Sequence, residues 1–278
     1  ADVIDCEISL SDGRSLSLRG GFGEDGSASG TLSPIEGKAM ISGEQGQSVT
    51  PVYQPIIAVS NGALCGFEAL ARWPVKAGVE VTDAGHAQAE DRSLAASMLE
   101  DACRVLASLK RPDLFVQVNV TGRDLAAGNL PGLVSDAMAK YHLAPRQLRI
   151  ELTEQAALRD IEQALVIVKE IKASGAGLVL DDFGTGQSSF AWLASLPADG
   201  LKIDHELVSR VGEPRMAKVI AAVTSLAHDL SMSVTAEGIE DEATLDILKS
   251  LKVDHVQGFL IARPMREADL VSYVADHR

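Results

Sequence analysis

The chain has 278 residues, of which 46% are hydrophobic and 4% aromatic, and its formal net charge is −14. This length suits one domain of α/β-barrel size, or a smaller domain with an appendage. The negative charge argues against a surface for a nucleic-acid polymer, although bound metal ions can still create a local site for a small phosphate diester. The cysteines Cys6, Cys65 and Cys103 lack the spacing of a zinc site, and no apolar stretch reaches the roughly 18 residues of a membrane span.

The first 48 residues differ in pattern from the rest. Residues 1–35 contain three short alternating segments separated by turn sequences, which predict a small β-meander. Residues 36–48 are polar and contain several glycines, as linkers do. Because three short strands cannot build a stable core, we interpret residues 1–48 as the end of an upstream domain plus a linker. The meander resembles the last strands of a PAS sensor domain. The chain begins at Ala1 without a signal peptide, so we expect a cytoplasmic fragment of a longer protein that is compatible with an upstream membrane anchor.

From residue 49 to residue 278, short apolar runs alternate with helix-length segments. The helical segments are 94–109, 131–140, 160–175, 214–230 and 241–250, and the longer ones show apolar residues at helical spacing. In the third segment, Asp160 is a suitable N-cap, Gly175 marks the end, and we expect the buried face to be Ile161, Leu165, Val168 and Ile171. In the fourth we expect the buried face to be Met216, Val219, Ile220, Val223, Leu226, Ala227 and Leu230.

This alternation over about 230 residues predicts a (β/α)₈ barrel, which typically needs roughly 250 residues. A doubly wound open sheet is the alternative, but the chain has neither a GxGxxG motif after the first strand nor a P-loop. Polar residues stand where the predicted strands end, so a barrel would gather them on one face. They are Glu68, Asn119, Glu151, Asp181, Lys202, Glu237 and Gln257. Carboxylate-rich sites of this kind suit Mg²⁺ or Mn²⁺, which take oxygen ligands.

Residues 51–275 resemble the EAL domain family of cyclic di-GMP phosphodiesterases. Eight motifs in family order carry the resemblance: YQPI (53–56), GFEALARW (66–73), VNV (118–120), ELTE (151–154), DDFGTG (181–186), KID (202–204), AEGIE (236–240) and QGF with RP (257–259 and 263–264). The resemblance implies hydrolysis of cyclic di-GMP to linear pGpG by two Mg²⁺ or Mn²⁺ ions. We expect Ca²⁺ to inhibit, because it prefers longer bonds and more ligands than these ions. Two ions close together clamp the attacking and leaving oxygens of a phosphodiester.

The resemblance also implies roles for individual residues. The metal ligands are Glu68, Asn119, Glu151, Asp181, Asp182 and Glu237. Lys202, with Glu68 and Glu237, is implied in catalysis, where the lysine orients the attacking water. The implied substrate-binding residues are Gln54, Leu70, Arg72, Asp204, Glu240, Gln257 and Pro264. Glu154 is implied to support the DDFGTG loop.

The chain departs from the family pattern in three places. The segment after Trp73 is short, Gln187 replaces the usual aromatic residue after DDFGTG, and His205 follows the KID motif where arginine is common. These departures keep a second hypothesis open, a sensor that binds cyclic di-GMP without cleaving it, because a small misalignment removes most of the rate of an enzyme. The resemblance further implies a homodimer through the region after DDFGTG, where Phe190, Trp192 and Leu193 are either interface or core residues. The PAS-like meander at the start of the chain leads us to expect an upstream sensor domain.

Overall fold

The computed structural model describes residues 3–9, 15–22, 28–34, 49–72, 93–153, 155–156, 161–184 and 193–277. The chain divides into two compact units, Ala1–Ser48 and Val49–Arg278. In the first unit, three strands form an antiparallel sheet with the second strand in the middle, as the turn pattern predicts. These strands are β1 (Val3–Ser9), β2 (Ser15–Phe22) and β3 (Ala28–Pro34). That this unit ends an upstream domain stays a prediction.

The second unit is a closed eight-stranded barrel with the order β10-β11-β4-β5-β6-β7-β8-β9, which excludes the open-sheet alternative. The strands are β4 (Thr50–Ala58), β5 (Leu64–Arg72), β6 (Phe115–Val120), β7 (Leu148–Thr153), β8 (Gly177–Phe183), β9 (Gly200–Ile203), β10 (Ser233–Ala236) and β11 (His255–Val256).

The barrel differs from a fully parallel one in its first strand. β4 runs antiparallel to both of its neighbours, whereas the other neighbouring strands are parallel. The connection from β4 to β5 is too short for a parallel crossover, which needs a dozen or more residues. It is a hairpin turn in which Gly62 has a φ of 71° and Asn61 Oδ1 accepts from the Ala63 amide at 3.0 Å. The Asn-Gly pair is the sequence signal for this hairpin.

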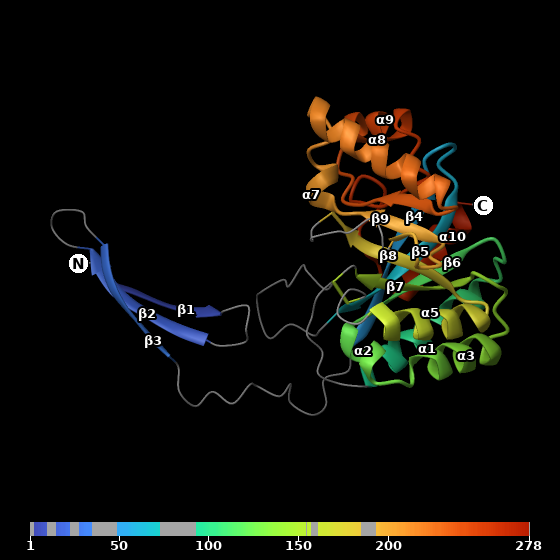
Figure 1. The fold of residues 1–278 in the computed structure, drawn as a ribbon, viewed down its shortest axis with the longest axis horizontal. Coiled ribbons are helices and arrows are strands. Elements are labelled where there is room, and N and C mark those ends of the chain that lie inside the picture. Colours follow the sequence, from blue (N-terminus) through green and yellow to red (C-terminus); the bar gives the residue numbers. More distant parts are fainter. Residues whose placement is uncertain are drawn as a thin grey trace. The chain divides into compact units, whose positions relative to one another are not determined.

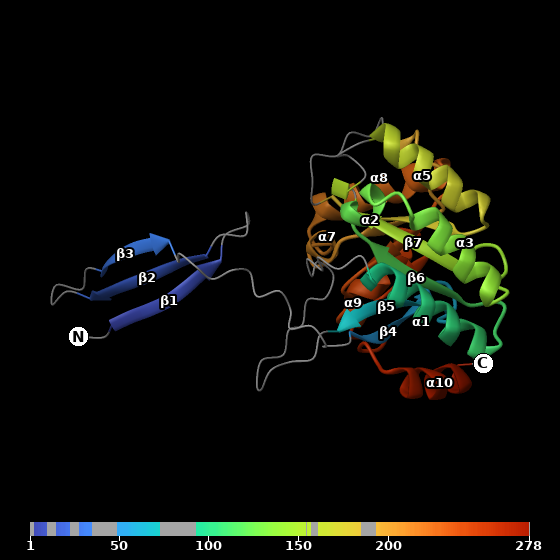
Figure 2. The ribbon, with the colours of Figure 1, turned by 90° about the horizontal axis from the view of Figure 1, so that it is seen from below.

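Helices surround the barrel (Figure 1). They are α1 (Ser93–Leu109), α2 (Gly122–Ala126), α3 (Leu130–Lys140), α5 (Ile161–Ala173), α7 (His205–Val208), α8 (Pro214–Asp229), α9 (Glu242–Ser250) and α10 (Glu267–Asp276). Neighbouring helices α10, α1, α3 and α5 contact one another in that order, and Figure 2 shows α1, α3 and α5 along one side. The five predicted helices are present, while the sequence analysis missed α10 and the short α2 and α7.

Two predicted core positions are wrong. Ile161 is 39% exposed and Val219 is 46% exposed. Ile161 is the first residue of α5, and the buried stripe of that helix begins one turn later, at Ala164. In α8 the buried stripe is Ile220, Val223, Thr224 and Ala227, so Val219 lies about 100° away from Ile220 around the helix axis. The predicted N-cap Asp160 lies outside the described residues.

Gly258 lies shortly after β11 and directly against the backbone of Ile239. A Cβ at this position would overlap the backbone N, C and O atoms of Ile239. The same segments are joined by hydrogen bonds, because Ile239 N donates to Gln257 O at 3.1 Å and Leu260 N donates to Ile239 O at 2.9 Å. Only glycine fits here, and the contact fixes the position of the neighbouring Gln257.

We therefore expect Gly258→Ala to lower the free energy of unfolding by about 3 kcal/mol or more, because backbone atoms cannot move aside as side chains can. Urea denaturation of the variant measures this. Gly132→Ala in α3 is the matched control: nothing lies within 4 Å of its added Cβ, so this variant should be as stable as the parent or slightly more stable. Equal stability of the Gly258→Ala protein and the parent would contradict the close approach.

Candidate functional site

The ammonium of Lys202 lies inside the barrel among four carboxylates. Lys202 Nζ is 2.6 Å from Glu237 Oε1, 3.0 Å from Glu151 Oε2, 3.2 Å from Glu68 Oε2 and 3.4 Å from Asp181 Oδ1. The lysine side chain is 1% exposed, and those of the four acids are between 0% and 20% exposed. These residues come from β5, β7, β8 and β9 and from the residue directly after β10. Closure of the barrel therefore brings together the acids that the sequence places far apart.

Amide side chains hold Glu68 from two directions. Asn119 Nδ2 donates to Glu68 Oε1 at 2.6 Å, and Gln257 Nε2 donates to Glu68 Oε2 at 2.9 Å. Gln257 also donates to Gln54 Oε1 at 3.1 Å, and Gln54 Nε2 donates to the Ala262 carbonyl at 3.0 Å. Four predicted site residues thus form one hydrogen-bonded network that fixes the orientation of the Glu68 carboxylate.

A β-bulge places the two consecutive aspartates of β8. Leu180 pairs with Leu201 and Phe183 pairs with Ile203, so β8 holds one more residue than β9 between these pairs. Asp182 adopts a φ of 56°, and Asp181 Oδ1 accepts from the Asp182 amide at 2.9 Å. In a regular strand consecutive side chains point to opposite faces, and the bulge breaks this alternation next to the carboxylate cluster.

Burial and mutual repulsion shift the pKa values of the cluster. Burial, together with the charge of Glu68, raises the pKa of Glu151 well above its ordinary value. Burial raises the pKa of Asp181, and it raises that of Glu237 to about 8, in both cases against the attraction of Lys202. Glu68 is the exception: burial opposes its ionisation, but the Lys202 ammonium and the bonds from Gln257 and Asn119 lower its pKa. Although burial disfavours the charged lysine, the surrounding acids raise the Lys202 pKa well above 10.5.

The donor atoms of the cluster suit a hard divalent cation. They are carboxylate oxygens plus the amide oxygen of Asn119, the ligand type that Mg²⁺ and Mn²⁺ prefer. Glu151 Oε1 and Gln257 Oε1 are buried acceptors without a hydrogen-bond partner, and buried acceptors of this kind call for a cation or a donor. As the side chains stand, the acids surround the lysine, and within the described part of the chain no three Asp, Glu, His or Cys side chains converge closely enough to hold a metal ion.

The other predicted residues lie at varying distances from this network in the sequence and differ in exposure. Leu70 is half-buried on β5, two residues from Glu68, and Arg72 is exposed at the end of that strand. Asp204 caps α7 by accepting from the Glu206 amide at 2.8 Å. Glu240 is exposed and Pro264 is half-buried. Glu154, Trp73 and Gln187 lie outside the described residues.

Sequence reasoning missed two buried polar residues in the barrel strands, Gln117 and Thr235. Gln117 pairs with Glu68 in the strand register and stands two residues before Asn119. Because side chains alternate along a strand, the spacing of Gln117 and Asn119 in FVQVNV was the signal that both face the same side.

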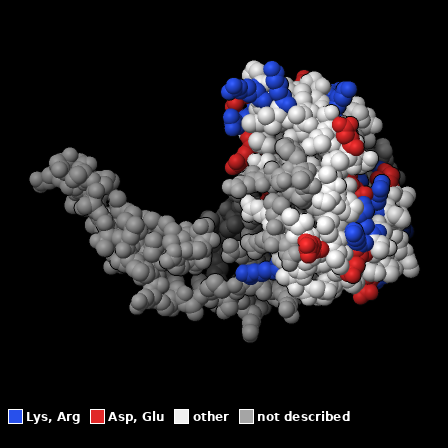
Figure 3. Space-filling model, viewed as in Figure 1, with Lys and Arg blue, Asp and Glu red and all other residues white. Residues whose placement is uncertain are grey.

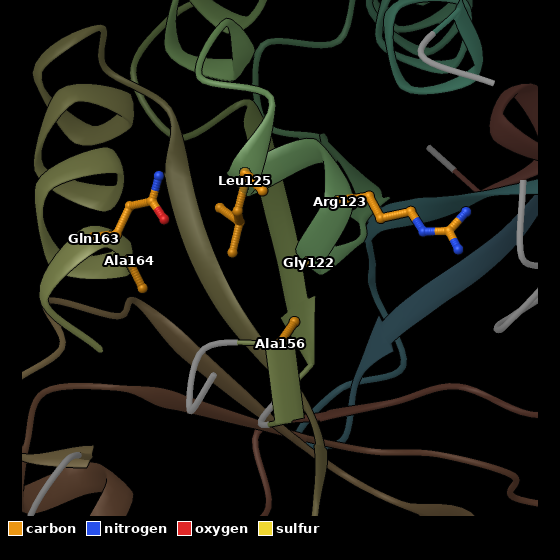
Figure 4. A pocket seen from close by; sticks show the side chains of 7 residues that line it. Gly122, Arg123, Leu125, Ala156, Gln163 and Ala164 are labelled. Carbon is orange, nitrogen blue, oxygen red and sulfur yellow. The ribbon is translucent and has the colours of Figure 1, made fainter. Parts of the chain in front are cut away.

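A separate pocket of about 230 Å³ lies between α2 and the start of α5. None of the cluster residues lines it; the lining residues are Gly122, Arg123, Leu125, Ala126, Ala156, Gln163 and Ala164. Figure 4 shows the Arg123 side chain extending away from Gln163 and Ala164. Five of the seven lining residues are glycine, alanine or leucine, and no carboxylate is among them, so we place the chemistry at the carboxylate cluster instead.

The described surface and helices add two observations. On the face in Figure 3, Lys and Arg side chains occur in separate groups among Asp and Glu. Across the described segments, no helix is both long and apolar enough to span a bilayer.

Comparisons with known proteins agree with the fold and the motifs. The family model described as EAL domain matches residues 39–264. The bifunctional diguanylate cyclase/cyclic di-GMP phosphodiesterase MucR of Pseudomonas aeruginosa is 33% identical over 232 residues, which are 80% of this chain and 34% of MucR. This chain thus spans about a third of the length of the curated relatives that it matches.

Solved structures show the same similarity. The structure of the MucR phosphodiesterase in complex with c-di-GMP has a TM-score of 0.69 and 32% identity, and the match covers 80% of this chain and 94% of that one. The manganese and cyclic di-GMP complex of BlrP1 from Klebsiella pneumoniae has a TM-score of 0.70 and 26% identity, and the match covers 80% of this chain and 57% of that one.

The shifted carboxylates predict how the stability of the metal-free protein depends on pH. Between the ordinary pKa of 4.5 and about 8, the folded chain holds a proton on Glu237 that the unfolded chain has lost, so the free energy of unfolding should fall as pH rises through this window. Calorimetry in EDTA should show a melting temperature lower at pH 8.5 than at pH 6 by roughly a few degrees. Glu237→Gln, which cannot titrate, should show a smaller change. The same pH dependence in both proteins would contradict this assignment.

Proposed function

The chain belongs to the EAL domain family, and we propose that it hydrolyses cyclic di-GMP to linear pGpG with the help of divalent metal ions. The observation that carries this proposal is the convergence of four carboxylates, an asparagine and a lysine inside the barrel. A structural core would not need such a cluster, since burying several carboxylates together is costly. The similarity to MucR, whose solved structure is a c-di-GMP complex, supports the choice of substrate.

We propose that Glu68, Asn119, Glu151 and Asp181 hold one ion, and that Asp181 also reaches a second ion held by Asp182 and Glu237. A pair of Mg²⁺ or Mn²⁺ ions would activate water and neutralise charge on the phosphoryl oxygens. The manganese in the complex of BlrP1 supports this choice of metal.

Residues of this chain orient the Glu68 carboxylate, mark the exposed side of the site and offer a positive charge to the substrate. The amides of Asn119 and Gln257 fix the orientation of the Glu68 carboxylate before any ligand arrives. Glu237 is the most exposed of the four acids around Lys202, at 20%, and we propose that it marks the side from which substrate enters. Arg72 at the exposed end of β5 can hold a phosphate of the substrate through its planar guanidinium.

A second function rests on a specific observation. The four acids contact Lys202, and within the described part of the chain they do not converge on a common metal position. A chain locked in this state would bind cyclic di-GMP as a sensor without cleaving it. Binding of the nucleotide without turnover in the presence of Mn²⁺ would favour this alternative.

Three further points belong to the proposal. We propose a homodimer through the region after DDFGTG, whose residues 185–192 lie outside the described chain. Leu193 is 1% exposed and belongs to the hydrophobic core. Of the two alternatives for this residue, core and dimer interface, its burial therefore favours the core. We also propose that a sensor domain precedes this one in the full-length protein and that this domain works in the cytoplasm.

The metal requirement can be measured directly. Purified protein with cyclic di-GMP and Mg²⁺ or Mn²⁺ should produce pGpG in a chromatographic assay, and excess EDTA should abolish the product. Ca²⁺ should inhibit, because it prefers longer bonds and more ligands than these ions. Full activity in EDTA would rule out the metal-dependent mechanism.

Substitutions should separate the metal ligands from the substrate-binding residues. Glu68→Gln and Asp181→Ala should lower kcat by about a thousandfold or more, because each removes a proposed ion ligand. Arg72→Ala should mainly raise KM, by about 10- to 100-fold, through loss of a charge-assisted hydrogen bond. Arg210→Ala is the matched control, since this exposed arginine pairs with Glu213 and should leave both constants unchanged. Near-normal turnover of Asp181→Ala, with circular dichroism of the parent, would refute the ligand assignment.

A further inference from the structure

Lys202 is the only member of the described carboxylate cluster that carries a positive charge. Its ammonium contacts one oxygen from each of Glu68, Glu151, Asp181 and Glu237 at 2.6–3.4 Å. An ammonium has three donor hydrogens, so four carboxylates already exceed its capacity for direct hydrogen bonds. The lysine therefore lies at the centre of the acids and does not pair with any one of them.

This position has a clear energetic consequence. Buried carboxylates without a positive charge among them would be strongly destabilising or would have to take up protons, and removal of one partner from a buried ion pair is far more costly than its net contribution suggests. The other donors to these acids are neutral: the side-chain amides of Asn119 and Gln257 reach Glu68, and the backbone amide of Asp182 reaches Asp181. Lys202 thus supplies the positive charge that offsets the cost of burying these acids when no metal ion is bound.

The contacts with Lys202 hold the acid oxygens farther from their common centre than a bound metal ion would. Ligand oxygens lie about 2.0–2.1 Å from Mg²⁺, whereas the acid oxygens lie 2.6–3.4 Å from the lysine nitrogen. A metal ion that binds the same oxygens therefore has to draw them into a tighter shell than the one around Lys202. The charge of the metal ion also repels the ammonium.

We propose that Lys202 is the internal counter-cation of the metal-free site and competes with the incoming divalent ions for the four carboxylates. Metal loading then exchanges one cation for another, and contacts to Lys202 that stabilise the metal-free protein weaken metal affinity by the same free energy. This inference rests on the proposed metal binding and goes beyond it, because a lysine that only orients water would leave metal affinity unchanged.

The test compares the parent with Lys202→Met and Lys202→Gln, using calorimetry for thermal unfolding in EDTA and isothermal titration with Mn²⁺ alone. In EDTA both neutral variants should melt roughly 5–15 °C lower than the parent. Their Mn²⁺ dissociation constants should be lower than that of the parent by a factor of about ten or more, because a repelling charge has been removed. A variant that folds only when Mn²⁺ is present would support the proposal in the same way.

Two controls isolate the charge and the position. Lys202→Arg keeps the positive charge and should therefore bind Mn²⁺ more weakly than either neutral variant. Lys172→Met removes a lysine that pairs with Asp199 outside the cluster, at 2.7 Å, and it should leave the Mn²⁺ affinity unchanged. Equal or weaker Mn²⁺ binding by folded Lys202→Met would overturn the exchange while leaving the proposed metal site intact. No Mn²⁺ binding by the parent or by any variant would instead refute the proposed metal site and, with it, the exchange.

A measurement on the parent protein covers the case in which neither neutral variant folds. The side-chain ammonium signal of Lys202, assigned in a ¹⁵N-lysine spectrum by its absence from Lys202→Arg, should shift when Mg²⁺ is added. An unchanged signal at saturating Mg²⁺ would show that the ammonium keeps its partners and would overturn the proposal.

Discussion

The burial of four acidic side chains around one ammonium is the constraint that the fold of this barrel has to satisfy. Glu68, Glu151, Asp181 and Glu237 belong to different segments of the chain, yet each contacts Lys202. Such a cluster is stable only where a rigid frame holds every charge next to a partner. The closed barrel is that frame, because it leaves no sheet edge free to move within the described chain and directs alternate side chains into a common interior.

Small irregularities of the frame set the details of the site. The bulge in β8 breaks the alternation at Asp181 and Asp182, and the hairpin before β5 reverses β4 so that Gln54 meets Gln257. The close approach at Gly258 fixes the segment that presents Gln257. Bulges and close approaches of this kind commonly adjust side chains near functional sites. The backbone thus determines which way the Glu68 carboxylate faces.

The sequence allowed the barrel and its acids to be predicted, because alternating strands and helices and polar residues at strand ends are local patterns. The reversed β4 was missed, although the Asn61–Gly62 pair in the short turn is a hairpin signal. Ile161 and Val219 turned out to be exposed because apolar residues at helical spacing do not show where the barrel wall ends. The position of Lys202 at the centre of the acids could not be predicted either. It depends on four contacts between residues far apart in the sequence, and a sequence motif does not show which acids a lysine will contact.

Anomalous diffraction from crystals grown with Mn²⁺ and cyclic di-GMP tests the central claim most directly. The account predicts manganese peaks bounded by the carboxylates of Glu68, Glu151, Asp181 and Glu237, with a phosphate of the nucleotide beside them and the Lys202 ammonium moved from at least one of its acids. Manganese bound only elsewhere, or a nucleotide bound away from the barrel interior while Lys202 keeps all four partners, would contradict it.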